Sequence, residues 1–431
     1  MTTVITVADP TGRDAVAAVW RIESARIVGA LARYTGDFAL AEDLAQEALA
    51  EALVSWPRDG VPREPAGWLL TVGRRRAIDA FRRRSARDER YAALAHQLGE
   101  GGAVTGAGPA DDPDDVLWDP DRIDDDVLAL IFTSCHPVLS REARVALTLR
   151  VVGGLTSDEI ARAFLVPTAT VQARITRAKK TLGAARVPFA VPPAEERAER
   201  LGSVLNVIYL VFTEGSTASS GDDLLRLDLA AEAQRLARVL ARLVDDEPDV
   251  HGLVALLELT AARFPARTGP DGAPVLLEHQ DRRRWDVTAI RRGRAALARA
   301  EGLGRGLGAY GLQAAIAECH AVAPSVRETD WERIVLLYEA LGRLAPSPVV
   351  DLNRAVAVSM TRGPAAAIAI VDELEGSPTL ASSHLLPSVR GELLTRLGRP
   401  DEARRALELA VERCGNERER DLLRRKIADL A

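Results

Sequence analysis

The side chains best suited to recognising another molecule lie between residues 155 and 182, in the segment LTSDEIARAFLVPTATVQARITRAKKTL. Thr156 precedes Glu159 by three residues, which is the spacing of a capping box at the start of a helix. After a short turn, Pro167 suits the start of a second helix. The segment therefore predicts a helix-turn-helix, a motif whose second helix enters the DNA major groove with its N-terminal side chains on base edges.

The second helix of this motif has an apolar face and a polar one. Val171, Ile175 and Ala178 are expected to face inward. Short hydroxyl and amide side chains on the other faces can contact bases, and cationic ones can neutralise phosphates. The candidate DNA contacts are Thr168, Thr170, Gln172, Arg174, Arg177, Lys179 and Lys180. The alternative is an ordinary helical hairpin with a solvated basic face, and the density of basic residues favours DNA binding.

A second candidate site lies in residues 64–84, EPAGWLLTVGRRRAIDAFRRR. An apolar stripe runs along a helix that otherwise carries consecutive arginines, which suit phosphate contacts, and an aromatic side chain beside them can stack on an unpaired base. The candidate contacts are Trp68, Arg74, Arg75, Arg76, Asp79, Arg82 and Arg83. The alternative, in which Trp68 belongs to the core and the arginines are only solvated, stays open at this point.

A third segment, residues 38–53, predicts a helix that buries Leu40, Leu44 and Ala48. Its adjacent face carries Asp43, Gln46 and Glu47. Taken alone, an acidic helix face of this kind indicates only contact with solvent.

The elements that position these residues are predicted to be helices. Apolar residues recur at helical spacing, alternating strand patterns are scarce, and aromatic residues make up only 4% of the chain, which argues against a β-sandwich or barrel. Towards the C-terminus, small and apolar residues are spaced as in a tetratricopeptide (TPR) helical hairpin. These residues are Gly391, Leu394, Gly398, Ala403, Leu407 and Ala410. The predicted fold class is all-α.

The charge distribution divides the chain. The net charge of −6 by itself argues against a nucleic-acid partner, but residues 74–90 carry eight arginines against three acidic residues. Residues 98–126 carry ten acidic residues against one arginine and are rich in Gly and Pro, which predicts a flexible linker. A second break falls at residues 187–196. The expected parts are therefore 1–97, a linker 98–126, a second module 127–187 and a helical region 195–431.

Other function classes find little support. The three cysteines lie too far apart for a zinc motif and are too few for a disulfide framework, and the six histidines are scattered, so neither a metal site nor a cofactor is expected. The polar segment 279–286, HQDRRRWD, is more typical of a turn with a capping Asp and a packed Trp285 than of an active site. Without a catalytic motif, a signal peptide or a membrane-spanning run, we expect a cytoplasmic protein that is not an enzyme.

Taken together and in this order, the segments resemble a bacterial RNA polymerase sigma factor of the extracytoplasmic-function (ECF, sigma-70) type. The residues that carry the resemblance are AEDLAQEAL, GWLLTVGRRRAIDAFRRR, LTSDEIARAFLVP and RAKK. Four further segments are similar to the subgroup with a long TPR-like C-terminal extension, and they are IFTSCHPVLSREARVALTLRVVGGLT, FTEGSTAS, HQDRRRWD and SPVVDLNRAVAV.

The resemblance implies a role for each segment. Residues 1–97 correspond to sigma region 2, in which Asp43, Gln46 and Glu47 fall where such factors contact the β′ clamp helices of core RNA polymerase. Trp68 and the arginine-rich helix fall where the promoter −10 element is melted and recognised. Residues 127–187 correspond to region 4, which meets the β flap and recognises the −35 element. The extension is implied to take over control of the factor, and its helices are expected to bind a protein or peptide.

Two rival functions remain. A one-component regulator with a helix-turn-helix and a helical sensor domain would bind operator DNA tightly without polymerase. A helical-repeat enzyme or scaffold would show turnover, or a partner that binds residues 195–431 independently of transcription.

Overall fold

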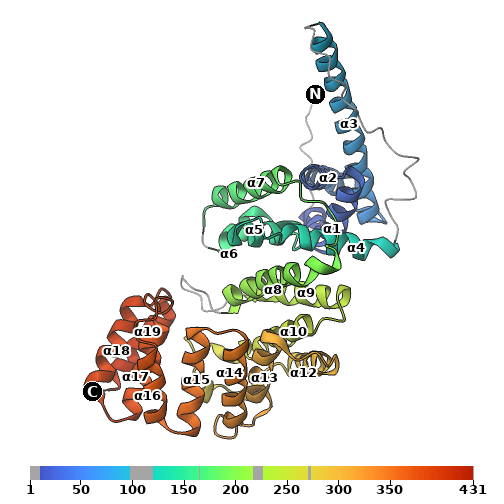
Figure 1. The fold of residues 1–431 in the computed structure, drawn as a ribbon. Helices are drawn as coiled ribbons and strands as arrows, with labels where there is room; N and C mark the ends of the chain where they lie inside the picture. Colours follow the sequence, from blue (N-terminus) through green and yellow to red (C-terminus); the bar gives the residue numbers. More distant parts are fainter. Residues whose placement is uncertain (1–9, 98–119, 165, 217–226, 270–272, 431) are drawn as a thin grey trace. The chain divides into compact units, whose positions relative to one another are not determined.

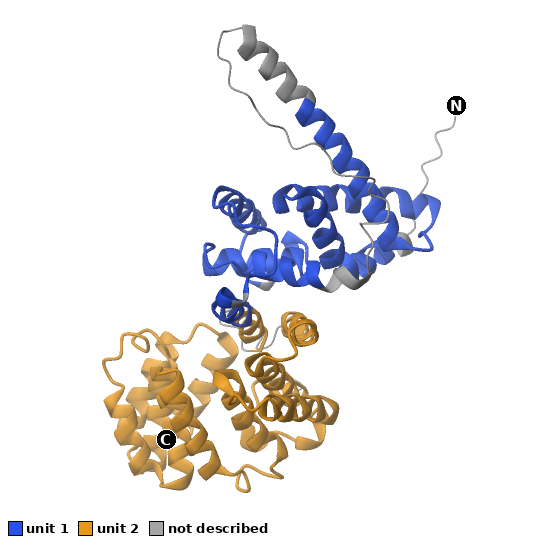
Figure 2. Ribbon diagram, turned by 45° about the vertical axis from the view of Figure 1, so that its right-hand side comes forward, with its two compact units in different colours: residues 1–207 blue, residues 208–431 orange. Residues whose placement is uncertain are grey.

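The structure is a computed structural model that describes residues 10–97, 120–164, 166–216, 227–269 and 273–430 (Figure 1). These residues form helices and no sheet, so the predicted all-α fold class is confirmed. One isolated bridge pairs Thr268 with Pro274. The chain divides into two compact units, residues 1–207 and 208–431 (Figure 2).

The division between the units falls inside a helix rather than in a loop. The first unit contains α1 (Pro10–Thr35), α2 (Phe38–Asp59), α3 (Pro65–Gln97), α4 (Pro120–Ser134), α5 (Arg141–Val151), α6 (Ser157–Ala163), α7 (Thr168–Ala184) and the first half of α8 (Ala194–Ser216). On this first half, Ser203 donates a hydrogen bond to the carbonyl of Cys135 (2.7 Å), and Arg200 donates to the carbonyl of Phe132. The start of α8 therefore packs on residues of the first unit.

Helices α1 to α3 form the N-terminal module of the first unit, and α4 packs against α1. Ile27, Leu31 and Leu69 are fully buried in its core. Asp37 caps α2 by accepting hydrogen bonds from the backbone amides of Ala39 and Leu40, which fixes where that helix begins.

The prediction that residues 98–126 form a flexible linker is wrong for residues 120–126. Residues 120–126 are the first part of α4, where Asp126 is buried and its carboxylate lies 3.0 Å from Arg33 Nε. The run of acidic residues indicated repulsion and disorder, but Asp126 has a cationic partner on α1, and the apolar residues 127–132 that follow are buried. The sequence of the predicted linker also contains three adjacent apolar residues, Val116, Leu117 and Trp118, and these lie outside the described residues.

The second unit is a series of helical hairpins. It contains α9 (Leu227–Leu243), α10 (Pro248–Ala261), α11 (Phe264–Arg267), the 3₁₀ turns η1 (Leu277–His279) and η2 (Arg282–Arg284), α12 (Val287–Gly302), α13 (Gly308–Val322), α14 (Trp331–Leu344), α15 (Pro348–Thr361), α16 (Pro364–Glu373), α17 (Leu385–Arg396), α18 (Pro400–Arg413) and α19 (Glu417–Ala428). From α13 to α19 each helix packs on the next in chain order (Figure 1).

The TPR-like hairpin predicted near the C-terminus is present as α17 and α18. Leu394, Ala403, Leu407 and Ala410 are buried between these helices and their neighbours. A Cβ atom on Gly391 would lie 2.7 Å from Leu407 Cγ, so the small residue permits the close approach of the two helices.

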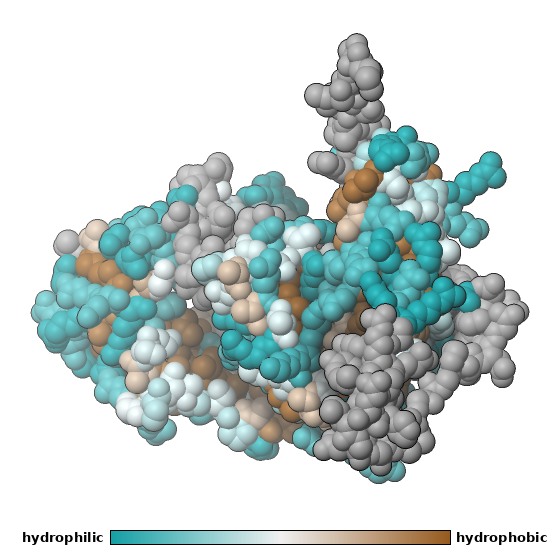
Figure 3. All heavy atoms as spheres, turned by 90° about the horizontal axis from the view of Figure 1, so that it is seen from above, coloured by the Kyte–Doolittle hydropathy of each residue, from teal (hydrophilic) through white to brown (hydrophobic). Residues whose placement is uncertain are grey.

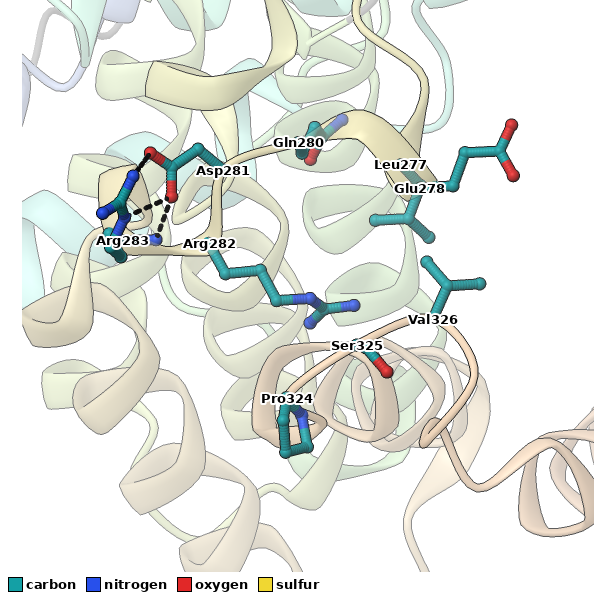
Figure 4. Close-up of a pocket in the computed structure, with 9 residues that line it drawn as sticks. All are labelled: Leu277, Glu278, Gln280, Asp281, Arg282, Arg283, Pro324, Ser325 and Val326. Atoms are coloured by element: carbon teal, nitrogen blue, oxygen red, sulfur yellow. Dashed lines mark hydrogen bonds and ion pairs between the residues drawn. The ribbon is translucent and has the colours of Figure 1, made fainter.

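The polar segment 279–286 is a turn, as predicted. Asp286 caps α12 by accepting from two backbone amides, and Trp285 is only 4% exposed beneath the guanidinium of Arg282. Arg282 also donates to the carbonyls of His320 and Ala323 at the end of α13. A hollow of about 300 Å³ lies between this turn and residues 324–326 (Figure 4).

Over the described residues, the surface visible in Figure 3 is mostly hydrophilic, and smaller hydrophobic areas lie among the hydrophilic ones. Within the described part of the chain, no helix combines the length and the hydrophobicity that crossing a bilayer requires.

Candidate nucleic-acid interface

The helix-turn-helix forms as the sequence predicts. Thr156 and Glu159 make a reciprocal capping box, in which the Thr156 amide donates to Glu159 Oε2 (2.8 Å) and the Glu159 amide donates to Thr156 Oγ1 (3.1 Å). Pro167 directly precedes α7. The predicted inward face of α7 is buried, with Val171, Ile175 and Ala178 at 6% exposure or less.

Replacing Thr156 by valine should lower the free energy of unfolding of the first unit by about 1 kcal/mol, the usual effect of losing an N-cap side chain. Valine keeps the branched shape but removes the oxygen that accepts the Glu159 amide hydrogen. Chemical denaturation followed by circular dichroism measures the change. Ser157→Ala, at the next position, should leave stability within about 0.5 kcal/mol, and equal losses in both variants would contradict a specific capping role.

The polar residues of α7 differ in what they contact. Gln172, Arg177 and Lys180 are exposed, and Arg174 and Thr170 are half-buried. Thr168 donates a hydrogen bond from Oγ1 to Asp158 Oδ1 (2.7 Å), so the start of α7 is tied to α6. Lys179 instead points to α2, where its Nζ lies 2.7 Å from Glu42 Oε2 and 2.6 Å from Asp43 Oδ1.

The arginines of α3 form two groups. Arg75 and Arg76 both pair with Glu51 of α2 at 2.9 Å, and the hydrogen bond from Arg76 contributes most to lowering the pKa of the Glu51 carboxyl. Arg74, directly before this pair, is half-buried. Nearer the C-terminal end of the helix, Arg82 and Arg83 form the second group and are exposed, as is Asp79. The first group orients α3 on α2, and the second presents charge to solvent.

Trp68 is neither a fully buried core residue nor a fully exposed one, which were the two alternatives that the sequence left open. Its side chain is half-buried, and its ring meets the edge of the buried Trp56 at a centroid distance of 5.6 Å. Trp56, which sequence reasoning missed, therefore supports Trp68 from α2.

Around Phe81 on α3, a surface hollow of about 400 Å³ is lined by residues of α2 and α3, which are Asp37, Leu40, Ala80, Phe81, Arg83 and Arg84.

The acidic face of α2 is occupied by cations of the second module. Asp43 pairs with Lys179, and Gln46 accepts a hydrogen bond from Arg150 of α5. Between them Glu42, whose side chain is 4% exposed, lies 3.5 Å from Arg150 and 2.7 Å from Lys179. We call this set of five residues the clasp. Glu47 is exposed and lies 3.8 Å from Arg76 of α3.

Electrostatics supports the clasp. Burial alone would lower the pKa of Lys179, but the carboxylates of Glu42 and Asp43 outweigh that effect and raise it. The predicted site set missed Glu42 and Arg150. Two signals could have found them: Glu42 falls among the small and apolar residues Ala41, Leu44 and Ala45, and Arg150 stands between Leu149 and Val151.

A second set of contacts joins the same two modules. Arg21 of α1 pairs with Glu159 of α6 at 2.7 Å. Gly154, with φ of 68°, lies so close to α1 that an added Cβ would be 2.7 Å from Ser24 Oγ. The candidate nucleic-acid side chains of α3 and α7 are therefore held in one packed unit, in which part of the α2 face is covered.

Three family models match the chain. Sigma-70 region 2 matches residues 21–87, sigma-70 region 4 matches residues 129–182, and a family of unknown function (DUF6596) matches residues 200–301. The first two matches contain the candidate residues of α2, α3 and α7 described above.

Curated relatives agree with these matches. An uncharacterized protein of Rhizobium meliloti (strain 1021) is 45% identical over 417 residues, which are 94% of this chain and 93% of the relative. The "Probable ECF RNA polymerase sigma factor SigI" of Mycobacterium tuberculosis is 30% identical over 43% of this chain and 60% of its own length. The "ECF RNA polymerase sigma factor SigK" of Mycobacterium ulcerans is 28% identical over 39% of this chain and 84% of its own length. No solved structure matches the chain.

Proposed function

This chain belongs to the ECF sigma factors of the sigma-70 type with a long C-terminal extension, and on that basis we propose how its residues divide the work of promoter recognition. As a sigma factor it serves promoter recognition in transcription initiation, with core RNA polymerase and promoter DNA as its partners. Since that work is done where the polymerase is, we propose the cytoplasm as its location, and we propose no catalytic residue.

The −35 element is recognised by α7. The observation that carries this assignment is the exposed polar side of a capped helix-turn-helix, on which Gln172, Arg177 and Lys180 are available to a major groove. Arg174 and Thr170 lie half-buried on the same helix, and Thr168 sits at its start. Gln172 suits base contact, and the cations suit phosphates.

The −10 element is melted and recognised by α3. Trp68 is braced by Trp56, so one ring can stack on an unpaired base while the other holds it in place. Arg82 and Arg83, with Arg74 further up the helix, supply positive charge for the backbone. Arg75 and Arg76 contribute through the orientation of α3, because both guanidinium groups already pair with Glu51.

Core polymerase is contacted by Asp43, Gln46 and Glu47 of α2, with the β′ clamp helices as the counterpart, while the second module contacts the β flap. Two of these three side chains are engaged by the clasp. The clasp must therefore open before α2 can bind the polymerase, and opening also frees Lys179 for DNA. The domain assignment that supports this scheme is region 2 in residues 1–97 and region 4 in residues 127–187.

The C-terminal extension, residues 195–431, regulates the factor by binding a protein or peptide on its helical hairpins. What supports this is a series of helices packed in chain order, an arrangement whose extended surfaces bind partners in other repeat proteins.

Transcription in vitro with bacterial core polymerase tests the proposal, using a promoter selected from genomic fragments. Full-length protein should start transcription only with core enzyme present. Changing Gln172 and Arg177 to alanine should reduce initiation by about tenfold or more, since the base contact of Gln172 is worth about 1–3 kcal/mol and the phosphate contact of Arg177 is lost with it. Binding to core enzyme should stay the same.

Arg197→Ala, an exposed arginine of α8, is the matched control and should initiate like the wild type. If neither protein initiates, yet the full-length chain binds the DNA tightly alone, the one-component regulator is the better assignment. Equal activity of the α7 variant and the control would remove the −35 role from this helix.

A further inference from the structure

Three metal-ligating side chains that sequence reasoning did not connect meet near the end of the second unit. His384 directly precedes α17, Cys414 directly follows α18, and Glu419 lies in the first turn of α19. His384 Nε2 lies 3.4 Å from Glu419 Oε2, and Cys414 Sγ lies 3.9 Å from the same oxygen. The three ligand atoms all lie within 4.8 Å of one another.

The local structure holds these groups in place while leaving a path to them. Cys414 is 2% exposed, whereas the side chains of His384 and Glu419 are 27% and 25% exposed. The buried Asn416 caps α19 by accepting hydrogen bonds from the amides of Arg418 and Glu419, which fixes the first turn that carries the carboxylate. A thiol thus lies at the base of the cluster, with an imidazole and a carboxylate at its rim.

The spacing of the three atoms matches a tetrahedral ion. Zinc bonds of ordinary length to S, N and O place a nitrogen and an oxygen ligand about 3.4 Å apart, and a sulfur and an oxygen ligand about 3.6 Å apart. The structure has 3.4 Å for the first pair and 3.9 Å for the second, and the sulfur and nitrogen atoms lie within 4.8 Å of each other, so side-chain movements of about 1 Å or less would complete the geometry.

We propose that His384, Cys414 and Glu419 bind one thiophilic divalent cation of the Zn²⁺ class, with water as the fourth ligand. A thiolate, an imidazole and a carboxylate form a set that selects zinc over the hard cations Mg²⁺ and Ca²⁺. On binding, the metal replaces the thiol proton, which leaves to solvent. The ion joins the start of α17 to the α18–α19 turn, so it closes the last hairpin of the extension.

Cobalt is the probe for this site, because Co²⁺ takes zinc geometry and its bond to a thiolate gives a near-ultraviolet charge-transfer band. The full chain is stripped with a chelator and titrated with Co²⁺, and Zn²⁺ is then added in competition. We expect one Co²⁺ per chain with a thiolate band that Zn²⁺ abolishes. No band, or a band that Zn²⁺ leaves intact, would overturn the proposal.

Variants separate the site from adventitious binding. Cys414→Ser should abolish the thiolate band, and Glu419→Gln, which keeps the size of the side chain, should weaken binding by at least tenfold. Cys319→Ser, at another buried cysteine of the same unit, should bind like the wild type. A band that survives Cys414→Ser, or that is lost equally in Cys319→Ser, would refute the assignment. None of these measurements depends on transcription, so their outcome is independent of the proposed function.

Discussion

Replacing Lys179 by methionine should raise the affinity of the full chain for core RNA polymerase by about tenfold or more. In the packed unit, Lys179 pairs with Asp43 and with the nearly buried Glu42. Removing one partner of a buried ion pair lowers the stability of the packed state by about 3–5 kcal/mol where the charges are fully buried. Lys179 is 16% exposed, so a part of that cost is expected, and about 1.4 kcal/mol already corresponds to tenfold.

The loss of Lys179 destabilises only the closed state, in which the contacts of the clasp are formed. When the modules separate, water hydrates Glu42 and Asp43, and the missing lysine no longer matters. The variant therefore populates the open state more, and the apparent dissociation constant for the polymerase falls as the competent fraction rises. Methionine keeps the length of the side chain, so packing against α2 changes little.

Fluorescence anisotropy with labelled core enzyme, without DNA, measures the affinity. Resonance energy transfer between dyes on α2 and α7 reports the separation of the modules. Lys180→Met is the matched control, because this neighbouring lysine is exposed and should leave both signals unchanged. Glu42→Gln opens the clasp from the other side and should act like Lys179→Met. Wild-type affinity in both clasp variants would mean that the contact does not restrain binding.

Replacing Gly252 by valine should lower the free energy of unfolding of the second unit by about 3 kcal/mol. Gly252 lies where α10 crosses α13, and a Cβ there would be 2.6 Å from the backbone nitrogen of Gly311 and 2.8 Å from its Cα. Because backbone cannot rotate away as a side chain can, the helices must separate. Separation opens the core around Ala255, Leu259 and Ala314.

Chemical denaturation followed by circular dichroism should show the transition of the second unit at lower denaturant in this variant. Gly302→Ala is the control, since a Cβ at the end of α12 meets no atom within 4 Å and the backbone there is helical. It should be neutral or stabilising by up to about 1 kcal/mol. Equal stability of Gly252→Val and the wild type would show that the crossing can adapt.

The same valine variant addresses the proposed role of the extension without shortening the chain. If the hairpins regulate initiation, loosening them should change transcription with core polymerase in either direction, while Gly302→Ala should not. An unchanged rate, with the second unit shown to be destabilised, would argue against regulation by the extension.

Residues close together in the sequence predicted several local features of this structure correctly. The capping box at Thr156, the buried face of α7, the α17–α18 hairpin and the turn at Trp285 were all predicted. Each depends on residues three or four positions apart, or on adjacent turns, so the chain itself determines which groups meet. The family resemblance rests on the same segments, and it too was available from the sequence.

Long-range packing decided the rest. The hydrogen bond from Lys179 to Glu42 spans 137 positions, and nothing in the spacing of α7 shows that this lysine faces α2 rather than solvent. The start of α4 was misassigned because a run of aspartates indicates repulsion until Arg33 is known to face Asp126. His384, Cys414 and Glu419 have no motif spacing, and three helix ends bring them together. Periodicity and capping thus determined the helices, whereas the pairing of charges across them depended on the burial that only the packed fold creates.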